Sequence, residues 1–410
     1  MNVSEWMYNA GIYGLIPASV IGTYKAFGGR SPDRNTMERI HPPDIGALPE
    51  NPRIWLHGAS VGEIQQVNKL LPWFEEMGYG TEDIIVSSQT RSGLGASDHP
   101  HDFILPFDYP PLLTGIYHRY DLQQLFVVET EIWPNLYRYH ENRVTMVNAR
   151  VKPYSFQYYR RVSGLVKTAL SNCERILART KQDARRFRVL TGKQVHVREV
   201  GPLKWVNLME PPGDDTLDQA EFSSDRPVLV AGSTWPGEEE LAIELARQLD
   251  MNLYIAPRHM DRLNEVRTML QKQDIEWKNF TDASSTVKCR VVLVNKMGIL
   301  TNLYNRADVV FVGGSWNEDV GGHNIIEPVT RGKPVVVGPH IRHVETTARL
   351  LRDFDLLKVF DSPGEARGHI NEFLDQPDEE LKNRLSKLRS RARNVKEVYV
   401  HQLKDILQVR

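Results

Sequence analysis

The segment 57–63 reads His-Gly-Ala-Ser-Val-Gly-Glu and puts one carboxylate directly after a run of strand-forming residues. Two glycines, Gly58 and Gly62, let the backbone turn tightly and approach a ligand closely. Glu63 would then open a helix, where a carboxylate can accept a proton from a substrate hydroxyl if its pKa suits the task. Alternatively, Glu63 only complements the positive end of the helix dipole. The residues alone leave both interpretations open.

A second cluster, Glu-Thr-Glu-Ile-Trp-Pro-Asn at 129–135, also follows a predicted strand. Carboxylates such as Glu129 and Glu131 accept hydrogen bonds from sugar hydroxyls, and the indole of Trp133 offers a flat apolar face. The same residues also suit a helix start, with acidic side chains at the positive end and Pro134 in the first turn. The cluster therefore indicates either a sugar-binding site or an ordinary helix N-terminus.

In the second half of the chain, Gly-Ser-Thr-Trp-Pro-Gly-Glu at 232–238 joins a predicted strand to a helix. Free backbone N–H groups at such a helix start, with the hydroxyls of Ser233 and Thr234, favour a phosphate. An ordinary Ser/Thr cap would give the same pattern. Arg258 and His259 follow another strand, where they can pair with a phosphate or a sugar carboxylate unless they are only surface residues.

Two glycine pairs belong to the densest cluster, which extends from Gly313 to Pro328. The second pair leads through His323 and Asn324 into a predicted helix whose N-terminus can face a phosphate. Glu327 would lie one turn after His323, on the same face of that helix. Its carboxylate could bridge two ribose hydroxyls, whereas the alternative is a glycine-rich connector with a buried, hydrogen-bonded Glu.

The elements that must position these clusters alternate between short apolar strands and helical stretches. Continuous apolar runs separated by helices predict parallel sheets that are covered on both faces. In such sheets ligands bind beyond the carboxyl ends of the strands, which is where each cluster falls. The predicted strands are 53–57, 83–88, 124–128, 144–147, 175–178, 228–231, 253–256, 291–294, 309–312 and 334–337.

The length of 410 residues suits two domains. The segment 210–227 is rich in Pro, Asp and Ser and lacks periodicity, so it predicts a linker. We therefore predict an α/β protein of two Rossmann-like, doubly wound domains, 41–209 and 228–377, that face a central cleft. An apolar and basic segment, 1–40, precedes them, and a charged helical tail, 378–410, follows.

Bulk composition argues against some classes of protein. Lys and Arg number 51 against 52 Asp and Glu, a formal net charge of -1 that argues against a dedicated nucleic-acid binder. Cys173 and Cys289 lie far apart and have no partners at metal-ligand spacing. We expect both to be small core residues, and we expect neither a zinc site nor a disulfide.

Two features favour contact with a membrane surface. Residues 11–24 are mildly apolar, but the run is shorter than the about 20 residues that span a bilayer, and Lys25 follows it. Such a helix can lie in the lipid interface with its cations near anionic headgroups. The segment 150–204 holds 14 Lys or Arg and three Asp or Glu, a bias that attracts phosphates. The alternatives are a helix packed on its own domain and a solvated basic face.

Together, these motifs resemble the Kdo transferase family of lipopolysaccharide synthesis. The resemblance extends from about Arg53 to about His343 and depends on seven segments in order: HGASVGE, ETEIWPN, NAR, GSTWPGEEE, APRH, VGGS and GGHNIIEP. It implies the GT-B architecture and the transfer of 3-deoxy-D-manno-oct-2-ulosonic acid (Kdo) from CMP-Kdo to a lipid A precursor, lipid IVA. It also implies a peripheral or monotopic enzyme on the cytoplasmic face of the inner membrane.

The resemblance assigns roles to individual residues. Glu63 matches the catalytic base, and Lys204 matches a Lys at the end of the first domain. The positions that match donor or nucleotide binding are Ser233, Thr234, Arg258, His259, Met297, Gly298, Gly322, His323, Asn324 and Glu327. We also expect contacts to phosphate or acceptor from Lys204, Ser60, Gly62, Glu131 and Arg91. We expect no metal ion and no cofactor besides CMP-Kdo as donor substrate.

The chain departs from the family pattern at a few positions. Trp235 follows Ser-Thr where the family usually has His. Residues 295–300 read NKMGIL where a DTMGEL-type segment is usual, and residues 90–93 read TRSG where Thr-Pro-Thr-Gly is usual. The positions that match the base and the ribose-binding Glu are unchanged.

The mechanism that follows is a direct displacement with inversion. Glu63 takes the proton of the acceptor hydroxyl while Arg258 and Lys204 stabilise charge on the leaving phosphate. Three alternatives remain: a GT-B transferase for another nucleotide sugar, a nucleotide-sugar epimerase that needs no lipid acceptor, and a non-catalytic module at a membrane.

Overall fold

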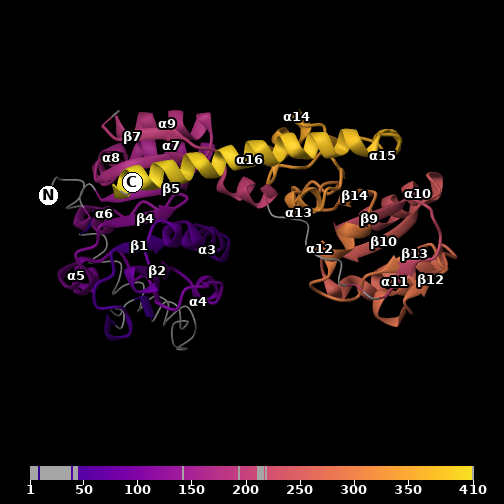
Figure 1. Cartoon of the computed structure of the whole chain (residues 1–410), viewed down its shortest axis with the longest axis horizontal. Coiled ribbons are helices and arrows are strands. Elements are labelled where there is room, and N and C mark those ends of the chain that lie inside the picture. The colour runs from indigo at the N-terminus through magenta and orange to yellow at the C-terminus, as the bar shows by residue number, and fades with distance from the viewer. Residues whose placement is uncertain are drawn as a thin grey trace. The chain divides into compact units, whose positions relative to one another are not determined.

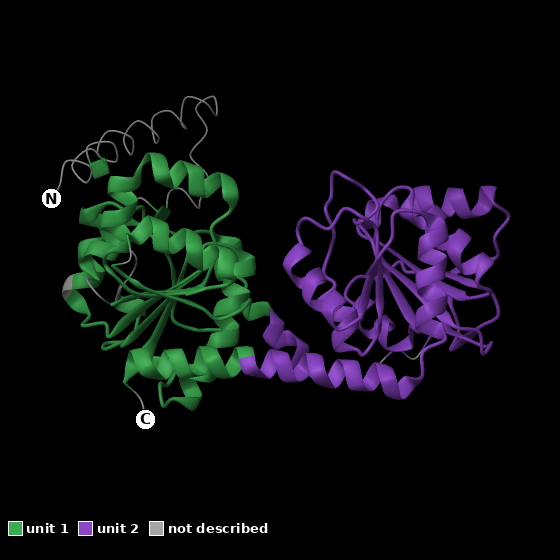
Figure 2. Ribbon diagram, turned by 90° about the horizontal axis from the view of Figure 1, so that it is seen from above, with its two compact units in different colours: residues 1–204, 395–410 green, residues 205–394 purple. Residues whose placement is uncertain are grey.

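The computed structural model describes residues 8–9, 38–39, 45–140, 143–192, 194–209, 217 and 219–408. The chain divides into two compact units, residues 1–204 with 395–410 and residues 205–394 (Figure 2). Of the predicted linker, 210–216 and 218 lie outside the described residues. Further along it, β8 (Glu221–Phe222) pairs with β12 (Thr286–Val287) inside the second unit, so this part of the segment is strand rather than loop.

The first unit contains a parallel sheet of seven strands in the order β3-β2-β1-β4-β5-β6-β7. Figure 1 labels β2, β1, β4, β5 and β7 of this sheet. The strands are β1 (Ile54–His57), β2 (Ile84–Ser88), β3 (Asp102–Ile104), β4 (Gln124–Val128), β5 (Val144–Ala149), β6 (Cys173–Ala178) and β7 (His196–Glu199). The helices are α3 (Val61–Glu76), α4 (Arg91–Leu94), α5 (Pro110–Arg119), α6 (Pro134–Tyr139), α7 (Pro153–Arg161), α8 (Ser163–Leu170) and α9 (Lys181–Thr191).

The second unit repeats this design with the order β11-β13-β10-β9-β14-β15-β16. Its strands are β9 (Val228–Thr234), β10 (Asn252–Pro257), β11 (Trp277–Asn279), β13 (Val291–Leu293), β14 (Val309–Val312), β15 (Val335–Val337) and β16 (Leu357–Val359). Its helices are α10 (Glu238–Gln248), α11 (Leu263–Lys272), α12 (Leu300–Leu303), α13 (Ile326–Thr330), α14 (Glu345–Asp353), α15 (Pro363–Leu374) and the first part of α16 (Asp378–Leu407).

Both faces of the second sheet are buried, as the apolar runs predicted. Along β9 and β10, Val230 and Tyr254 pack into one core cluster, whereas Leu229 and Leu253 pack into another. Because successive side chains of a strand point to opposite faces, two clusters mean that helices cover the sheet on both sides. Cys173 and Cys289 are buried and free, which confirms the prediction of two core thiols.

In each sheet the order of strands reverses at one point, which is where doubly wound proteins bind ligands. In the first unit β1 has β2 on one side and β4 on the other; in the second unit β9 lies between β10 and β14. All ten strands predicted from the sequence are present, each within two residues of its predicted bounds at either end, or three at the end of β9. The alternation of strands and helices therefore confirms two doubly wound α/β sheets.

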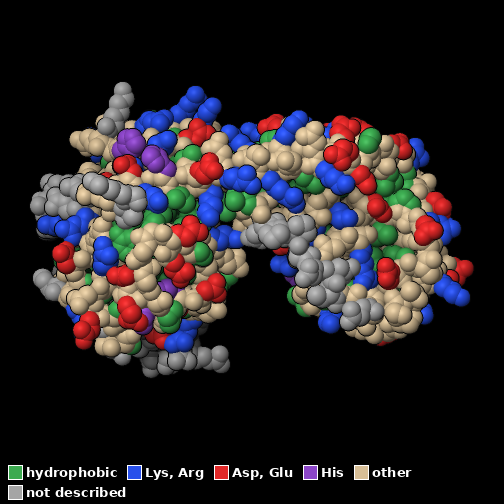
Figure 3. All heavy atoms as spheres, in the orientation of Figure 1, with side chains coloured by type: hydrophobic (Ala, Val, Ile, Leu, Met, Phe, Trp, Pro, Cys, Tyr) green, Lys and Arg blue, Asp and Glu red, His purple; other side chains and the backbone are tan. Residues whose placement is uncertain are grey.

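Acidic and basic side chains are interspersed over the face shown in Figure 3, in keeping with the nearly balanced numbers of the two kinds. The predicted segment 1–40 lies outside the described residues except for positions 8–9 and 38–39. Among the helices that the structure describes, none is both long and apolar enough to cross a bilayer.

Candidate functional site

The first candidate site lies at the switch point of the first sheet, where β1 and β4 end side by side. His57 pairs with Val127 in the parallel register of these strands. Helix α3 begins four residues after β1, so Glu63 falls in its first turn. Glu129 and Glu131 follow the end of β4 directly. The topology therefore brings three carboxylates to the same edge of the sheet.

Glu63 is held by its own turn. Its Oε2 accepts hydrogen bonds from the backbone N–H of Ala59 at 2.6 Å and of Ser60 at 3.0 Å. Gly58 permits this geometry, because a Cβ at that position would lie 3.0 Å from the backbone of Glu63 and Ile64. Glu63 is therefore both a capping residue and a carboxylate at the sheet edge, and the two interpretations of the sequence are compatible.

The surroundings raise the pKa of Glu63 to about 7. Burial is the largest cause, followed by the negative charges of Glu129 and Glu131, while the hydrogen bonds from Ala59 and Ser60 act in the opposite direction. A carboxylate with a pKa near 7 is matched to proton transfer at neutral pH.

Glu129 is linked to two neighbouring elements. It has a left-handed backbone with φ of 63°, and its Oε1 accepts a hydrogen bond from Nε2 of Gln66 at 3.2 Å. Oε1 of Gln66 accepts from Nδ2 of Asn148 at 2.5 Å, and Oδ1 of Asn148 accepts from the N–H of Leu203 at 3.1 Å. This series of hydrogen bonds connects α3, β4 and β5 to the residue before Lys204. Gln66 was not predicted as a site residue, although it lies one turn after Glu63.

Glu131 has a different set of partners. Its Oε2 accepts from Nε2 of Gln89 at 2.5 Å, and burial raises its pKa. Arg39 donates to Oε1 of Gln89 at 3.5 Å, and its guanidinium lies 4.3 Å from the ring centroid of Phe107. Arg39 was not predicted, because nothing near it in sequence shows that it packs beside β2 and β4.

Lys204 lies within a group of cations. Burial lowers its pKa to about 8, the charges of Arg179 and Arg150 act in the same direction, and Glu129 raises it. Arg179 is itself under the influence of Arg150 and Glu129, which places these four charged groups close together. Part of the basic segment 150–204 thus faces the edge of the sheet that carries Glu129.

The three other predicted contacts of the first unit lie close to the same edge. Ser60 is exposed and offers its N–H to Glu63. Gly62 is exposed too, and apart from its chain neighbours and the backbone of its own helix, no described residue comes within 4 Å of the place that a Cβ would take there. Arg91, in the first turn of α4, forms an ion pair with Glu38. The sequence did not predict this partner of Arg91.

In the second unit, one buried carboxylate joins the loops at the switch point. Glu238 is fully buried, and its two oxygens accept four backbone N–H groups at 2.8–3.1 Å. The donors are Trp235, Gly314, Ser315 and Trp316. Burial raises the pKa of Glu238, and these hydrogen bonds lower it. Glu238 therefore fixes the turn after β9 to the loop after β14.

Ser233 and Thr234 occupy different positions in this turn. Ser233 is half-buried and has a left-handed backbone with φ of 58°. Thr234 is fully buried, and its hydroxyl donates to Oε1 of Glu239 at 2.8 Å, which in turn pairs with Arg262. The hydroxyl of Thr234 thus stabilises the turn from the buried side, whereas Ser233 lies nearer the surface of the protein.

Arg258 and His259 lie beside the glycine loop. The N–H of Arg258 donates to the carbonyl of Thr234 at 3.0 Å. The pKa of His323 is lowered by burial and by the charges of Arg258, His259 and His343, so these four residues are neighbours. Such a group of cationic and imidazole side chains is suited to an anionic ligand.

The prediction that His323 and Glu327 share a helical face is wrong. Gly321 and Gly322 have φ of 87° and 89°, and α13 begins only at Ile326. His323 and Asn324 therefore belong to the loop. Nδ2 of Asn324 donates to Oε1 of Glu327 at 2.8 Å, so the amide rather than the helix orients this carboxylate.

Met297 and Gly298 form an exposed turn after β13. The side chain of Met297 is 67% exposed, and Gly298 has φ of 80°. A large apolar side chain exposed next to a strand end is available for contact with a ligand.

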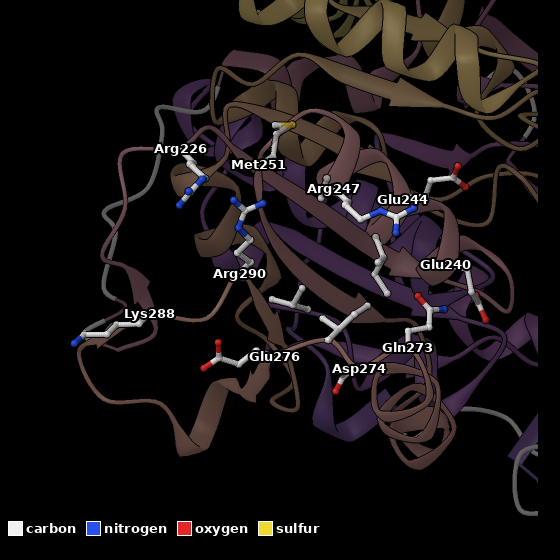
Figure 4. Close-up of a pocket in the computed structure, with 14 residues that line it drawn as sticks. Arg226, Glu240, Glu244, Arg247, Met251, Gln273, Asp274, Glu276, Lys288 and Arg290 are labelled. Carbon is white, nitrogen blue, oxygen red and sulfur yellow. The ribbon is translucent and has the colours of Figure 1, made fainter.

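A cavity of the second unit lies away from these loops. It measures about 880 Å³ and is lined by residues that precede β10 and β13, including Met251 and Arg290 (Figure 4). It therefore opens at the amino edge of the sheet, opposite the edge with the glycine loops. Two of the cationic side chains that line this cavity, Arg226 and Arg290, already pair with Asp250.

Within the described residues, no group of three or more His, Cys, Asp or Glu is arranged to hold a metal ion.

Known proteins resemble this chain in sequence. A family model for 3-deoxy-D-manno-octulosonic-acid transferase (kdotransferase) matches residues 34–207. A bifunctional glycosyltransferase/methyltransferase of Fusobacterium nucleatum is 30% identical over 325 residues, which are 75% of this chain and 50% of that protein. A 3-deoxy-D-manno-octulosonic acid transferase of Chlamydophila psittaci is 27% identical over 318 residues, 73% of this chain and 72% of that protein. The chain thus spans only half the length of the Fusobacterium relative.

Solved structures resemble it in fold. A glycosyltransferase of Rickettsia africae has a TM-score of 0.55 at 11% identity and covers 87% of this chain and 98% of its own. A UDP-GlcNAc 2-epimerase of Neisseria meningitidis has a TM-score of 0.55 at 13% identity and covers 86% of this chain and 100% of its own. The fold and the sequence matches together define a glycosyltransferase of the GT-B architecture. Within this class, the family model over residues 34–207 and the named relatives support a Kdo transferase.

Proposed function

We propose that this protein transfers Kdo from CMP-Kdo to a lipid A precursor, with inversion at the anomeric carbon and with Glu63 as the base. The observation that carries the proposal is the state of Glu63. It lies at the switch point of the first sheet, is fixed by two backbone N–H groups, and has a pKa of about 7. A carboxylate without these features would be fully ionised and a weaker base at neutral pH.

The transfer exchanges one bond for another. The acceptor hydroxyl oxygen attacks the anomeric carbon of Kdo, its proton passes to Glu63, and the bond to the phosphate oxygen of CMP breaks. CMP leaves with the electron pair of that bond. Cations that lie near the leaving phosphate stabilise its growing charge, and we assign this role to Arg258 and Lys204.

The second unit is proposed to bind the donor. Arg258, His259 and His323 gather at the edge of the sheet where the loops after β9 and β14 meet. Ser233 supplies a hydroxyl near the surface of that turn, Asn324 orients Glu327 for the ribose, and exposed Met297 flanks the nucleotide. Each of these assignments follows from the family motif, and the geometry supports it.

The first unit is proposed to bind the acceptor at the inner membrane surface. Helix α7 has no buried residue and ends in Arg160 and Arg161, while Tyr154 and Tyr158 are 76% and 57% exposed. Basic and aromatic side chains of this kind suit a phosphorylated glycolipid and its headgroup region. The apolar stretch 11–24 was predicted to contribute as well.

A product assay tests the proposal. Purified protein is incubated with CMP-Kdo and lipid IVA, and the lipid product is weighed by mass spectrometry. Addition of one or more Kdo residues is expected. Unchanged lipid, while the same protein consumes another nucleotide sugar in the presence of its acceptor, would assign it to a different transferase. Conversion of a nucleotide sugar without any acceptor would make it an epimerase, the function of one structural neighbour.

A further inference from the structure

Trp235, the residue that departs from the family pattern, contacts His323 directly. Its indole Nε1 lies 2.8 Å from Nε2 of His323. The two rings are nearly parallel, with an interplanar angle of 19° and centroids 6.2 Å apart. The ring of His259 meets the same indole edge-on, with centroids 5.1 Å apart. Trp235 therefore contacts both imidazoles of the predicted donor site.

This hydrogen bond has only one possible direction. An indole N–H donates and cannot accept, so Nε2 of His323 must supply a lone pair. A histidine with a lone pair on Nε2 is neutral and carries its proton on Nδ1. An imidazolium would present a second N–H to the indole N–H, and the contact would be lost. With His at position 235, either ring could donate or accept, and the tautomer would not be fixed.

The surroundings of His323 also favour its neutral form. Arg258, His259 and His343 are the charged or titratable groups that face it, and all three disfavour a positive charge on its ring. The ring also lies against Gly314, where a Cβ would come within 2.6 Å of Cδ2 of His323 and 2.8 Å of Nε2. Gly314 has φ of 68°, so both its conformation and the available space require glycine.

We propose that Trp235 is a positioning residue that presents His323 to the donor as a neutral Nδ1–H group rather than as a cation. This inference extends the proposed function, because it assumes that the anion of a nucleotide binds in the second unit. Arg258 then supplies the charge, and His323 supplies one directional hydrogen bond to a phosphate or carboxylate oxygen. Donor binding should accordingly be insensitive to the protonation of His323 across the neutral range.

The tautomer can be observed directly in the full-length protein. Selective ¹⁵N labelling of histidine and long-range ¹H–¹⁵N correlation distinguish Nδ1–H, Nε2–H and the imidazolium, and His323→Gln identifies the resonance. The wild-type protein is expected to show the Nδ1–H form at pH 7. In Trp235→Phe, which keeps a ring but loses the donor, His323 should show both tautomers and titrate at a higher pH. An Nε2–H or charged His323 in the wild type would overturn the proposal.

Binding of CMP provides a second measurement. At pH 8, Trp235→Phe should bind CMP about five-fold more weakly than the wild type, as expected for one lost orienting hydrogen bond. As pH falls to 6, His323 of the variant gains a proton that favours the phosphate, so the ratio of the two Kd values should fall toward or below one. Because the phosphate of CMP titrates equally in both proteins, the ratio of the two Kd values reports only the effect of protonating His323.

The control is Trp277→Phe, which changes a partly buried Trp of the same unit that lies on β11. This variant should give a ratio near one at every pH. A Trp235→Phe ratio that stays constant between pH 6 and 8 would show a merely structural role and would refute the proposal. If the wild type does not bind CMP, the proposed function fails, whereas the tautomer measurement still decides the role of Trp235.

Discussion

Two opposing influences determine the chemistry of Glu63. Burial and the charges of Glu129 and Glu131 favour its protonated form, whereas the N–H groups of Ala59 and Ser60 favour the carboxylate. The first influence prevails, but the hydrogen bonds keep one oxygen fixed in place. A base that is both oriented and close to half-ionised at neutral pH is the combination that proton abstraction needs.

Replacement of Glu63 by Gln tests its role as base. The amide oxygen of Gln can still accept from Ala59 and Ser60, so the fold and CMP binding should be unchanged. Turnover should fall by about 10²-fold or more, because no group remains to take the proton. Glu75→Gln, on an exposed position of α3, is the control and should be fully active. Near-normal turnover of Glu63→Gln would exclude Glu63 from this role.

The pH dependence of kcat/KM tests the environment of Glu63. Since the base must be ionised, kcat/KM should rise with pH and level off above about 7, the pKa of this carboxyl. Glu129→Gln removes a neighbouring negative charge, which lowers the pKa of Glu63. The rise of kcat/KM, the acid limb of the pH profile, then moves to lower pH. Glu129 also raises the pKa of Lys204, so any limb due to Lys204 should shift downward too. An acid limb that does not move in Glu129→Gln would contradict the assignment.

At the scale of elements, the loops after β9 and β14 depend on the first residue of α10. Glu238→Gln replaces one accepting oxygen by an amide N–H₂ that faces backbone donors. The loss should cost the second unit about 2–4 kcal/mol of unfolding free energy, because buried N–H groups lose their acceptor. CMP binding should weaken as well. Denaturant unfolding and CMP titration measure both effects.

The control for this variant is Glu240→Gln, two residues later and exposed. It should change neither the stability of the second unit nor CMP binding. Equal behaviour of the two variants would show that the buried carboxylate does not hold the loops together.

The elements predicted from the sequence were those whose signals are local. Buried central strands such as β4 and β14 are continuous apolar runs, which no solvent-exposed segment resembles. Edge strands were missed: β7 (His196–Glu199) has three exposed residues of four, and β3 (Asp102–Ile104) has only three residues. Such strands are defined by a neighbour that lies far away in sequence.

The candidate site, too, was predictable only where its signals are local in sequence. The motifs located Glu63 and the glycine loop, because both follow apolar strands. The start of α13 was misplaced, since a helix period cannot show that Gly321 and Gly322 keep the chain in a left-handed conformation. The bond from Trp235 to His323 joins residues 88 positions apart, and no local pattern contains it.

At the scale of the whole molecule, the chain returns to its first unit after completing the second. Residues 395–410 belong with residues 1–204, so the last turns of α16 complete a unit that began almost 400 residues earlier. Tyr399 is fully buried there and donates from its hydroxyl to the carbonyl of Gly201 at 2.9 Å. Arg175 on β6 donates to Gln402 and pairs with Asp405. The first unit therefore depends on the end of the chain for part of its core.

Tyr399→Ala tests this dependence. Removal of a buried ring should lower the unfolding free energy of the first unit by about 3–5 kcal/mol, the usual cost of a large aromatic cavity. Calorimetry of a two-unit protein should show two transitions, and the one that CMP raises is assigned to the second unit. The variant should lower the other transition and leave the CMP-sensitive one in place. His401→Ala, on an exposed position two residues later, should lower neither. A fall in the CMP-sensitive transition alone would place Tyr399 in the wrong unit and refute the division of the chain.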